Sequence, residues 1–395
     1  GLEKRPKLRF PGFDDPWKET TLSALFSKST QKNADGHITN VICNSAKLGL
    51  IPQREYFDKD IANSDNTSGY YIIRQNDFVY NPRKSSDAPY GPISSYKYAE
   101  DGIVSPLYLC FHAKGEINPL YYEWYFRSSA WHRYIYMSGD SGARHDRVSI
   151  KDDTFFAMPI NLPSEQEQSK IASFLQSLDE RIAAQEKLVA SLKKYKRGVN
   201  NQILSQIDNS YNCRLGSVCE IVGGGTPDTL HAEYWGNTVE WFTPSEIGKT
   251  KYVNNSVRKL SDIGLDNSSA KLLPIGTVLL TTRATLGEMS IAKRECSTNQ
   301  GFQSLIPHTD RVSSEYLYYM QIIIKPWCEK YASGNTFREI SKSALSDCII
   351  PIPDRARQEQ IVKLLSSIDM IIDAAESISM SLSKIRHGLM QQLFI

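Results

Sequence analysis

The stretch that decides the fold is LPSEQEQSKIASFLQSLD at residues 162–179, because the chain repeats it as IPDRARQEQIVKLLSSID at residues 352–369. Identical residues recur in one ungapped register, from Pro163 and Pro353 through to Gln202 and Gln392. Chance does not hold one register over a stretch of this length. The sequence therefore predicts a tandem duplication in which both fold and function are two-fold.

Each copy predicts one long helix, because its apolar residues step by three and four positions. Such a narrow seam suits pairing with another helix better than packing on a broad core. Ser164 with Glu167 fits a capping box, and Asp354 can cap the second helix. The residues expected to pair the helices are Ile171, Leu175, Leu178, Ile182, Gln185 and Leu192 in the first copy and Ile361, Leu365, Ile368, Ile372, Ala375 and Leu382 in the second.

We therefore expect an α+β fold: two α/β domains separated by two long helices that form an antiparallel coiled coil with pseudo-two-fold symmetry. The expected segments are a domain over 1–160, a helix over 161–208, a domain over 209–352 and a helix over 353–395. Near the midpoints of the helices, Gln185 should face Ala375. Each domain should close with a hydrophobic strand that runs into proline, Phe155–Pro159 and Cys348–Pro351. The alternative is two unrelated amphipathic helices buried in separate domains.

Composition excludes several classes of protein. The chain has 395 residues, 41% of them hydrophobic, and a formal net charge of +2. These values are ordinary for a soluble protein of two or three domains, and no apolar run is long enough to span a membrane. The seven cysteines are scattered and lack a C-x-x-C pair, which argues against a zinc site and favours a cytoplasmic location.

Motifs that carry catalysis or bind cofactors are missing from the sequence. The glycine-rich run Gly223–Pro227 is not followed by Gly-Lys-Ser/Thr, so a nucleotide site is disfavoured. The histidines lack metal-binding spacing, and there is no Gly-x-Ser-x-Gly motif. We therefore expect no catalytic residue, no metal and no cofactor in this chain, whose role would be binding.

Polar and aromatic recognition chemistry remains. Arg and Lys can bind guanine edges, Asn and Gln can bind adenine, and hydroxyl groups can bind phosphates. For any single residue, a hydrogen bond that stabilises the fold is an equally good reading. The candidate DNA contacts are Arg74, Asn76, Arg83, Lys84, Arg144 and Arg147 in the first domain and Gly224, Thr226, Thr282, Arg283, Gln300, Asn335, Thr336 and Arg338 in the second.

Over nearly its whole length the chain resembles the specificity subunits of Type I restriction-modification enzymes. The motifs that carry the resemblance are Pro6–Phe13 through Trp17, Pro163–Ile171, Gly223–Pro227 with Tyr234-Trp235 and Trp241–Ile247, and Arg283–Gly287 with Asn299–Phe302. The second helix departs from the pattern by placing Arg357 where the first has Glu167. The order of these motifs, together with the duplicated helices, makes the resemblance specific.

The resemblance implies two target recognition domains, each reading one half of a bipartite, asymmetric site on double-stranded DNA. It also implies two modification subunits, which hold S-adenosylmethionine and dock around the helices. Restriction subunits would add translocation and cleavage driven by ATP and Mg²⁺. The chain itself would catalyse nothing.

Two other functions stay open at this level. One is a coiled-coil scaffold with two protein-binding domains, which a salt-dependent DNA mobility shift would exclude. The other is a fused methyltransferase-nuclease, which methylation by the isolated chain would support.

Overall fold

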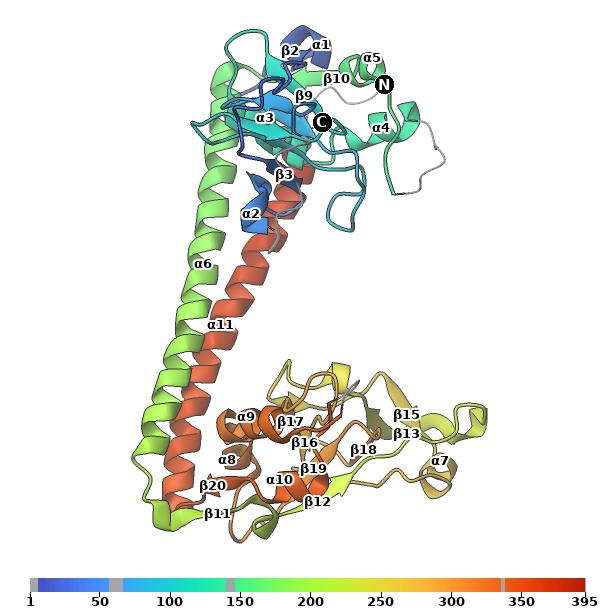
Figure 1. Ribbon diagram of the computed structural model, residues 1–395, viewed down its shortest axis with the longest axis vertical. Coiled ribbons are helices and arrows are strands. Elements are labelled where there is room, and N and C mark those ends of the chain that lie inside the picture. The colour runs from blue at the N-terminus through green and yellow to red at the C-terminus, as the bar shows by residue number, and fades with distance from the viewer. Residues whose placement is uncertain (1–5, 57–66, 140–145, 335–337, 395) are drawn as a thin grey trace. The chain divides into compact units, whose positions relative to one another are not determined.

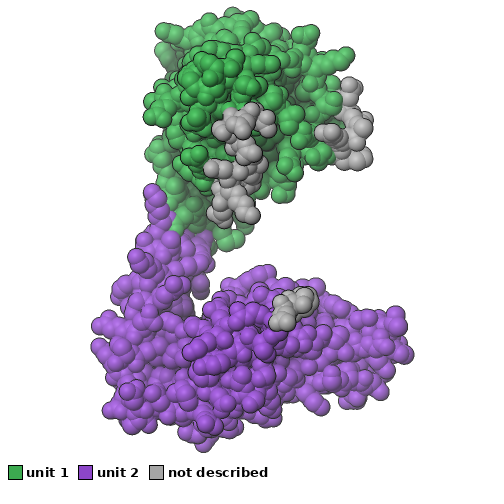
Figure 2. Space-filling model, viewed as in Figure 1, with its two compact units in different colours: residues 1–186, 377–395 green, residues 187–376 purple. Residues whose placement is uncertain are grey.

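The computed structural model describes residues 6–56, 67–139, 146–334 and 338–394. The chain divides into two compact units, shown in different colours in Figure 2. Unit 1 contains residues 1–186 and 377–395, and unit 2 contains residues 187–376. Within the described ranges, no helix is both long enough and apolar enough to cross a membrane.

Unit 1 is built around a four-stranded antiparallel sheet with the strand order β2-β9-β6-β7 (Figure 1). Three two-stranded sheets, β1-β10, β3-β4 and β5-β8, complete its strands among the described residues. The elements are β1 (Lys18–Thr21), α1 (Leu22–Leu25), β2 (Phe26–Lys28), β3 (Ile42–Ser45), β4 (Gly49–Pro52), α2 (Gln53–Tyr56), β5 (Tyr71–Ile73), β6 (Phe78–Tyr80), β7 (Ile93–Ser95), β8 (Gly102–Val104), β9 (Leu109–Ala113), α3 (Pro119–Arg127), α4 (His132–Ser138), α5 (Asp152–Phe156) and β10 (Pro159–Leu162).

Buried aromatic rings hold this sheet against its helices. Phe26 of β2 meets Phe78 of β6 and Phe111 of β9 edge-on, with centroid distances of 5.5 and 5.3 Å. Phe126 of α3 and Phe155 of α5 lie 5.9 and 5.8 Å from Phe111. Such pairs add about 0.5–1.5 kcal/mol each beyond the area they bury, so this cluster fixes the helices on the sheet.

Unit 2 has a five-stranded sheet with the order β12-β19-β16-β17-β14 and a three-stranded sheet with the order β15-β13-β18. A two-stranded sheet, β11-β20, lies at its junction with the long helices. The elements are η2 (Asn209–Tyr211), β11 (Asn212–Arg214), η3 (Leu215–Ser217), β12 (Cys219–Gly223), η4 (Ala232–Tyr234), β13 (Trp235–Phe242), η5 (Pro244–Glu246), β14 (Tyr252–Val253), β15 (Arg258–Leu260), α7 (Asp262–Asp266), β16 (Val278–Leu280), β17 (Met289–Ala292), β18 (Cys296–Thr298), β19 (Gln303–Pro307), α8 (Ser314–Tyr319), α9 (Gln321–Tyr331), α10 (Lys342–Ser346) and β20 (Ile349–Pro351).

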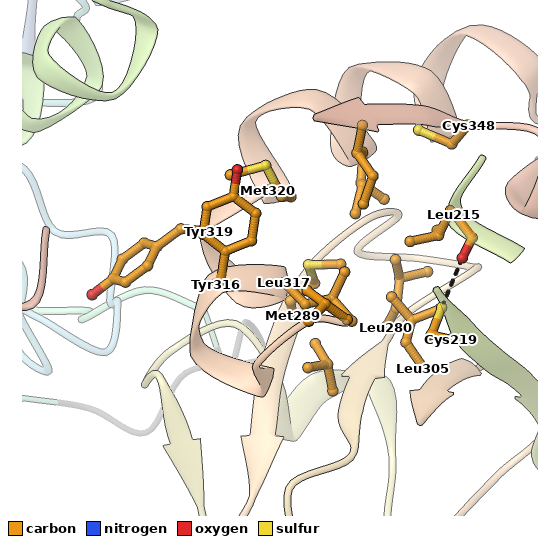
Figure 3. Close-up of a cluster of buried hydrophobic side chains, with 14 of the residues drawn as sticks. Leu215, Cys219, Leu280, Met289, Leu305, Tyr316, Leu317, Tyr319, Met320 and Cys348 are labelled. Atoms are coloured by element: carbon orange, nitrogen blue, oxygen red, sulfur yellow. Dashed lines mark hydrogen bonds between the residues drawn. The ribbon is translucent and has the colours of Figure 1, made fainter. Parts of the chain in front are cut away.

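The core of unit 2 relies on aliphatic and sulfur-containing side chains. Figure 3 shows Leu280, Met289 and Leu305 from the sheet gathered near Leu317 of α8, and all four are fully buried. The Cys219 thiol donates a hydrogen bond of 3.3 Å to the carbonyl oxygen of Leu215. The two units therefore share an architecture class but fill their interiors with different side chains.

The units nevertheless begin and end alike. In each, the first strand pairs antiparallel with the last strand before a long helix: β1 with β10, and β11 with β20. The predicted closing strand Phe155–Pro159 is wrong for its first residues, because Phe155 and Phe156 end helix α5 and β10 starts at Pro159. Two acidic residues in the first turn and the burial of Phe155 favour that helix.

The long helices are α6 (Glu165–Ser205) and α11 (Arg355–Leu393), and both start as predicted. The Ser164 hydroxyl accepts a hydrogen bond of 3.3 Å from the Glu167 N–H, and Asp354 caps α11 in the same way. The predicted capping box is only half formed, because the Glu167 carboxylate instead binds Arg9.

The proline and the glutamine that recur in both copies form a hydrogen bond at the start of each long helix. In α6 the buried side chain of Gln168 donates a hydrogen bond of 3.1 Å to the carbonyl oxygen of Pro163. In α11 Gln358 donates to Pro353 over 2.9 Å. A buried carbonyl group requires a hydrogen-bond donor, and each glutamine supplies one where the chain enters the helix.

In unit 1, segments of the two long helices lie side by side (Figure 1), and an ion pair joins them. Arg386 of α11 pairs with Asp179 of α6. Arg127 of α3 contacts the same carboxylate at 3.6 Å and lies over the Trp124 ring. Asp179 therefore joins both helices to the globular part of unit 1.

Unit 2 uses the same aspartate of the repeat. Lys196 of α6 pairs with Asp369 of α11, and the Tyr319 hydroxyl of α8 donates to Asp369 over 2.7 Å. Lys193 also pairs with Glu376 at 2.6 Å. In unit 2 the order of the pairs, Lys193 with Glu376 and Lys196 with Asp369, shows that the helix segments run antiparallel. The predicted α+β fold with antiparallel helices is confirmed.

The apolar seam has two roles where one was predicted. Ile171 and Leu175 belong to the aromatic core of unit 1, and Ile361 and Leu365 belong to the core of unit 2. The first turns of each helix therefore pack on a broad core as well as on the other helix. Of the other seam residues, Ile182, Ile368, Ile372 and Ala375 are buried, and Leu178, Gln185, Leu192 and Leu382 are half-buried.

We expect Leu365→Ala to lower the free energy of unfolding by about 2–5 kcal/mol, because it empties a fully buried site. Leu364→Ala is the matched control, because this neighbouring side chain is 47% exposed and its loss should change stability by less than about 0.5 kcal/mol. Urea denaturation followed by circular dichroism measures both. Equal losses would contradict the packing described here.

Candidate nucleic-acid interface

The surface of unit 1 carries a groove of about 830 Å³ that is lined by basic side chains. Four cations line it against a single carboxylate, that of Asp87. The four are Lys47, Arg83, Lys84 and Arg147. A concave surface with this charge balance attracts anions, since cations along low-dielectric walls reinforce one another.

Backbone hydrogen bonds hold the two basic segments of this groove together. The Lys84 N–H donates to the Asp146 carbonyl over 2.8 Å, and the Val148 N–H donates to Pro82 over 2.9 Å. Arg83 and Arg147 therefore face each other as a β-bridge. Their side chains are placed by the fold, although they come from distant parts of the sequence.

The floor of the groove is rigid. The Asn44 amide donates to the carbonyl oxygens of Val79 and Pro92, at 2.8 and 3.2 Å, and accepts from the Ser94 hydroxyl at 2.8 Å. Gly91 is required beside it, because a Cβ there would lie 2.1 Å from the Asn81 carbonyl oxygen. This floor fixes the strand ends from which the basic residues project.

The cations of the groove are available to a ligand. Lys47 reaches Asp87 only at 3.6 Å, and Arg147 reaches Asp146 at 4.0 Å. Exposed pairs of this kind contribute little, so an anion can displace them. Within the described ranges, Arg83 and Lys84 have no ion-pair partner.

Of the residues predicted in this domain, Arg83, Lys84 and Arg147 come together in the groove, and Arg144 lies outside the described residues. Arg74 and Asn76 do not line it. The Arg74 guanidinium binds Gln31 at 2.9 Å and Asp101 at 3.5 Å, and Asn76 has a φ of 71° in a turn. The structure therefore gives these two residues roles within the fold.

Lys47 is a groove residue that the sequence did not single out. It lies in the turn between β3 and β4, where Gly49 has a φ of 71°. A cation in a hairpin turn between two short strands is a weak signal, because most such residues are simply solvated. Only the fold shows that this turn meets the Arg83 segment.

In unit 2 the glycine run lies flush against the end of β18. A Cβ on Gly224 would lie 2.0 Å from the Asn299 carbonyl oxygen, and one on Gly225 would lie 2.2 Å from the Ser269 hydroxyl. The Trp241 indole N–H donates to the Gly225 carbonyl over 3.0 Å. The glycines are thus explained by close packing, and they place Thr226 on the surface, where its hydroxyl donates to Gln300.

A second group of predicted residues joins this patch through Gly301. The Thr282 N–H donates to the Gly301 carbonyl over 2.8 Å, and Arg283 pairs with Glu339 at 2.9 Å. Thr282 itself is fully buried, and its hydroxyl donates to Glu339 over 3.3 Å. Thr282 therefore positions Glu339, and through Glu339 the Arg283 side chain.

The patch in unit 2 thus gathers Gly224, Thr226, Thr282, Arg283 and Gln300. Arg338 is exposed, and its guanidinium donates to the Glu329 carbonyl. Asn335 and Thr336 lie outside the described residues. The sequence missed Glu339, since an acidic residue is not an expected ligand of nucleic acid.

Metal-ligand clusters and reactive thiols are two kinds of chemistry that can be checked among the described residues. They include no group of three or more His, Cys, Asp or Glu side chains that could hold a metal ion. Burial raises the pKa of the Cys110, Cys219 and Cys296 thiols to about 12. These thiols stay protonated at neutral pH, so they are inert as nucleophiles.

Comparison with known proteins identifies one family. The family model described as "Type I restriction modification DNA specificity domain" matches the chain over residues 24–194 and 208–382. The chain is 34% identical over 186 residues to the MjaIX Type I restriction enzyme specificity subunit of Methanocaldococcus jannaschii, covering 46% of this chain and 43% of that protein. It is 25% identical over 246 residues to the EcoR124I/EcoR124II specificity subunit of Escherichia coli, covering 58% and 60%. The matches thus span less than two thirds of either relative.

Solved structures share the fold. The structure titled "Crystal structure of Type-I restriction-modification system S subunit from M. genitalium" superposes with a TM-score of 0.54 at 15% identity, covering 99% of both chains. A chain from a study of "complex assembly" and "conformational transition of the type I R-M system" superposes with a TM-score of 0.65 at 19% identity, covering 98% of this chain and 99% of that one.

We expect Gly224→Ala to destabilise the protein by about 1–3 kcal/mol, because the added methyl group must displace the backbone of Asn299. The adjacent substitution Gly223→Ala is the control, since the nearest atoms to its Cβ lie 3.8 Å away. Thermal unfolding compares the two variants. A Gly224→Ala protein as stable as Gly223→Ala would show that the glycine run is not tightly packed.

Proposed function

This chain belongs to the family of Type I restriction-modification DNA specificity subunits, and we propose that each of its two units recognises one half of a bipartite, asymmetric DNA site. The single observation that carries the proposal is the basic groove of unit 1. Its four cations come from three separate parts of the chain and meet over a rigid floor. Cations in such an arrangement bind successive backbone phosphates.

The patch of unit 2 supports the same role with different chemistry. Gln300 offers an amide that can bind adenine bidentately, and Arg283 offers a guanidinium that can bind guanine. The Thr226 hydroxyl can bind a base or a phosphate. Two units with different exposed side chains suit two different half-sites, which is what an asymmetric site requires.

The long helices are proposed to set the spacing of the half-sites. At 41 and 39 residues, α6 and α11 are each roughly 60 Å long at 1.5 Å per residue. Neighbouring half-sites on one face of DNA lie about 34 Å apart per helical turn. Helices of this length are therefore long enough to hold two units over separate major grooves.

A row of exposed apolar residues on α11 supports docking of partner subunits. Leu364, Ile371, Ile378 and Ile385 recur at every seventh position, and between 47% and 56% of each is exposed. Residues seven apart lie on nearly the same face of a helix, and a heptad row of this kind pairs with another helix. On α6, Phe174, Leu188 and Tyr195 are also exposed.

We propose that helical segments of two modification subunits cover these rows. In this assembly the modification subunits hold S-adenosylmethionine and methylate the DNA, and restriction subunits supply cleavage driven by ATP and Mg²⁺. The chain contributes the choice of sequence and no chemical step. Mapping methylated adenines in host DNA with and without this chain tests the role as a whole.

We expect Lys84→Ala and Arg147→Ala each to weaken DNA binding and to lower the salt slope by about 0.9, the value for one lost phosphate contact. Fluorescence anisotropy of labelled duplex DNA at several salt concentrations measures this slope. Arg74→Ala is the control, because Arg74 is exposed but bound to Gln31 and Asp101 outside the groove. An unchanged slope in both groove variants would place the DNA elsewhere.

We expect the double change Ile371→Glu and Ile378→Glu to abolish co-purification with a co-expressed modification subunit, because it puts two charges into an apolar contact. DNA binding by the chain alone should persist. Lys384→Glu, about 100° around the helix from Ile385 of the row, is the control and should co-purify normally. If both proteins co-purify equally well, the row is not the docking face.

A further inference from the structure

In unit 1 the N-terminal segment fills a groove between the start of α6 and the end of α11. The Arg9 guanidinium binds the Glu167 carboxylate through two hydrogen bonds of 2.8 Å, and Glu167 is 1% exposed. The hydrogen bond to Glu167 raises the pKa of Arg9. The Leu8 N–H also donates to the Gln392 carbonyl of α11 over 3.1 Å. This segment, residues 8–10, is called the arm below.

The aromatic residue of the arm completes the contact. The Phe10 ring meets Phe174 edge-on at 5.5 Å, and the Lys170 ammonium lies 5.9 Å from the Phe10 centroid. Phe10 also packs on the core that contains Ile171 and Leu389. The arm is therefore recognised by one charge, one aromatic ring and one backbone hydrogen bond.

Unit 2 has a groove at the same place in the repeat. It has a volume of about 320 Å³. The residues that line it are Val199, Gln202, Ile203, Gln206, Arg357, Gln360, Ile361 and Leu364. In the register of the duplication, Arg357, Gln360, Ile361 and Leu364 stand where Glu167, Lys170, Ile171 and Phe174 stand in unit 1, and Val199, Gln202 and Ile203 stand where Leu389, Gln392 and Leu393 stand.

The charge at the centre of the unit 2 groove is reversed. Arg357 replaces Glu167, and its guanidinium donates only to the Gln360 side chain, at 3.3 Å, among the described residues. Leu364 replaces Phe174 and is 47% exposed, so the apolar wall remains open. A ligand shaped like the arm would fit here if it carried a carboxylate in place of the Arg9 guanidinium.

We propose that the unit 2 groove binds a segment of a partner protein in which a carboxylate residue is followed by a large aromatic residue. The carboxylate pairs with Arg357 and the ring packs on Leu364 and Ile361. The arm of a second copy of this chain is disfavoured, because its Arg9 would face Arg357. The groove is separate from the proposed DNA-binding surfaces, and it shares Leu364 with the proposed docking row on α11.

Two labelled peptides test the proposal on the full-length chain by fluorescence anisotropy. One is residues 6–13, PKLRFPGF, and the other is the same peptide with Arg9→Glu. We expect the Arg9→Glu peptide to bind the unchanged chain about fivefold more tightly, the value of one exposed charge pair gained. Further replacement of the peptide's Phe10 by alanine should remove that binding.

Arg357→Glu in the chain should reverse the preference between the two peptides. This variant is expected to fold, because glutamate is favourable in the first turn of a helix and stands at the matching position of α6. The PKLRFPGF peptide can also displace the arm in unit 1, but that exchange does not involve residue 357. A difference in peptide binding between the unchanged chain and the Arg357→Glu variant therefore comes from the unit 2 groove alone. Circular dichroism confirms that the variant is folded.

Three outcomes would overturn the proposal. One is that neither peptide binds saturably, which would mean that the groove takes no arm-like segment. The preference could survive Arg357→Glu unchanged, which would place the peptide elsewhere. The part of the binding that depends on residue 357 could favour PKLRFPGF in the unchanged chain, which would point to the arm of a second copy instead of an acidic partner.

Discussion

Each unit depends on one aspartate that the duplication places at the same position twice. Asp179 and Asp369 each bind a cation from the other long helix and a side chain from the globular part of the same unit. Half-exposed ion pairs stabilise little by themselves. A carboxylate that contacts three elements nevertheless fixes the orientation of the globular part on the long helices. Any rotation of the globular part would break one of the contacts of this carboxylate. Whatever the exposed loops bind, the direction in which they point is set here.

The two units use this common junction to present different surfaces. Unit 1 offers a groove in which loosely paired cations predominate, and unit 2 offers a patch of hydroxyl, amide and guanidinium groups. Arg283 is held by Glu339, whereas Arg83 has no such partner among the described residues. A guanidinium held in place suits a contact of fixed geometry, and a loosely held one suits a phosphate that can shift. The difference lies in exposed side chains, which the fold does not constrain.

The sequence predicted the parts of the structure that depend on periodicity and local chemistry. Both long helices, the cap at Asp354 and the shared register follow from residues close together in the chain. The errors come from tertiary contacts. The hydrophobic run that contains Phe155 is typical of a strand. In the structure Phe155 lies in the short helix α5, and its ring packs in the core of unit 1. The burial of Thr282 and its hydrogen bond to Glu339, 57 positions along the chain, are likewise tertiary contacts that the local sequence does not indicate.

The same distinction explains which residues the two copies share. Gln168 and Gln358 each satisfy a proline carbonyl, and both are buried. Substitution of either would leave a buried acceptor without a partner, at a cost of about 1–3 kcal/mol. Glu167 and Arg357 differ because their environments differ: one is covered by the arm and the other faces an open groove. Divergence between the copies is therefore informative in itself, since a position that has exchanged one charge for the opposite charge has also exchanged the ligand that it can bind.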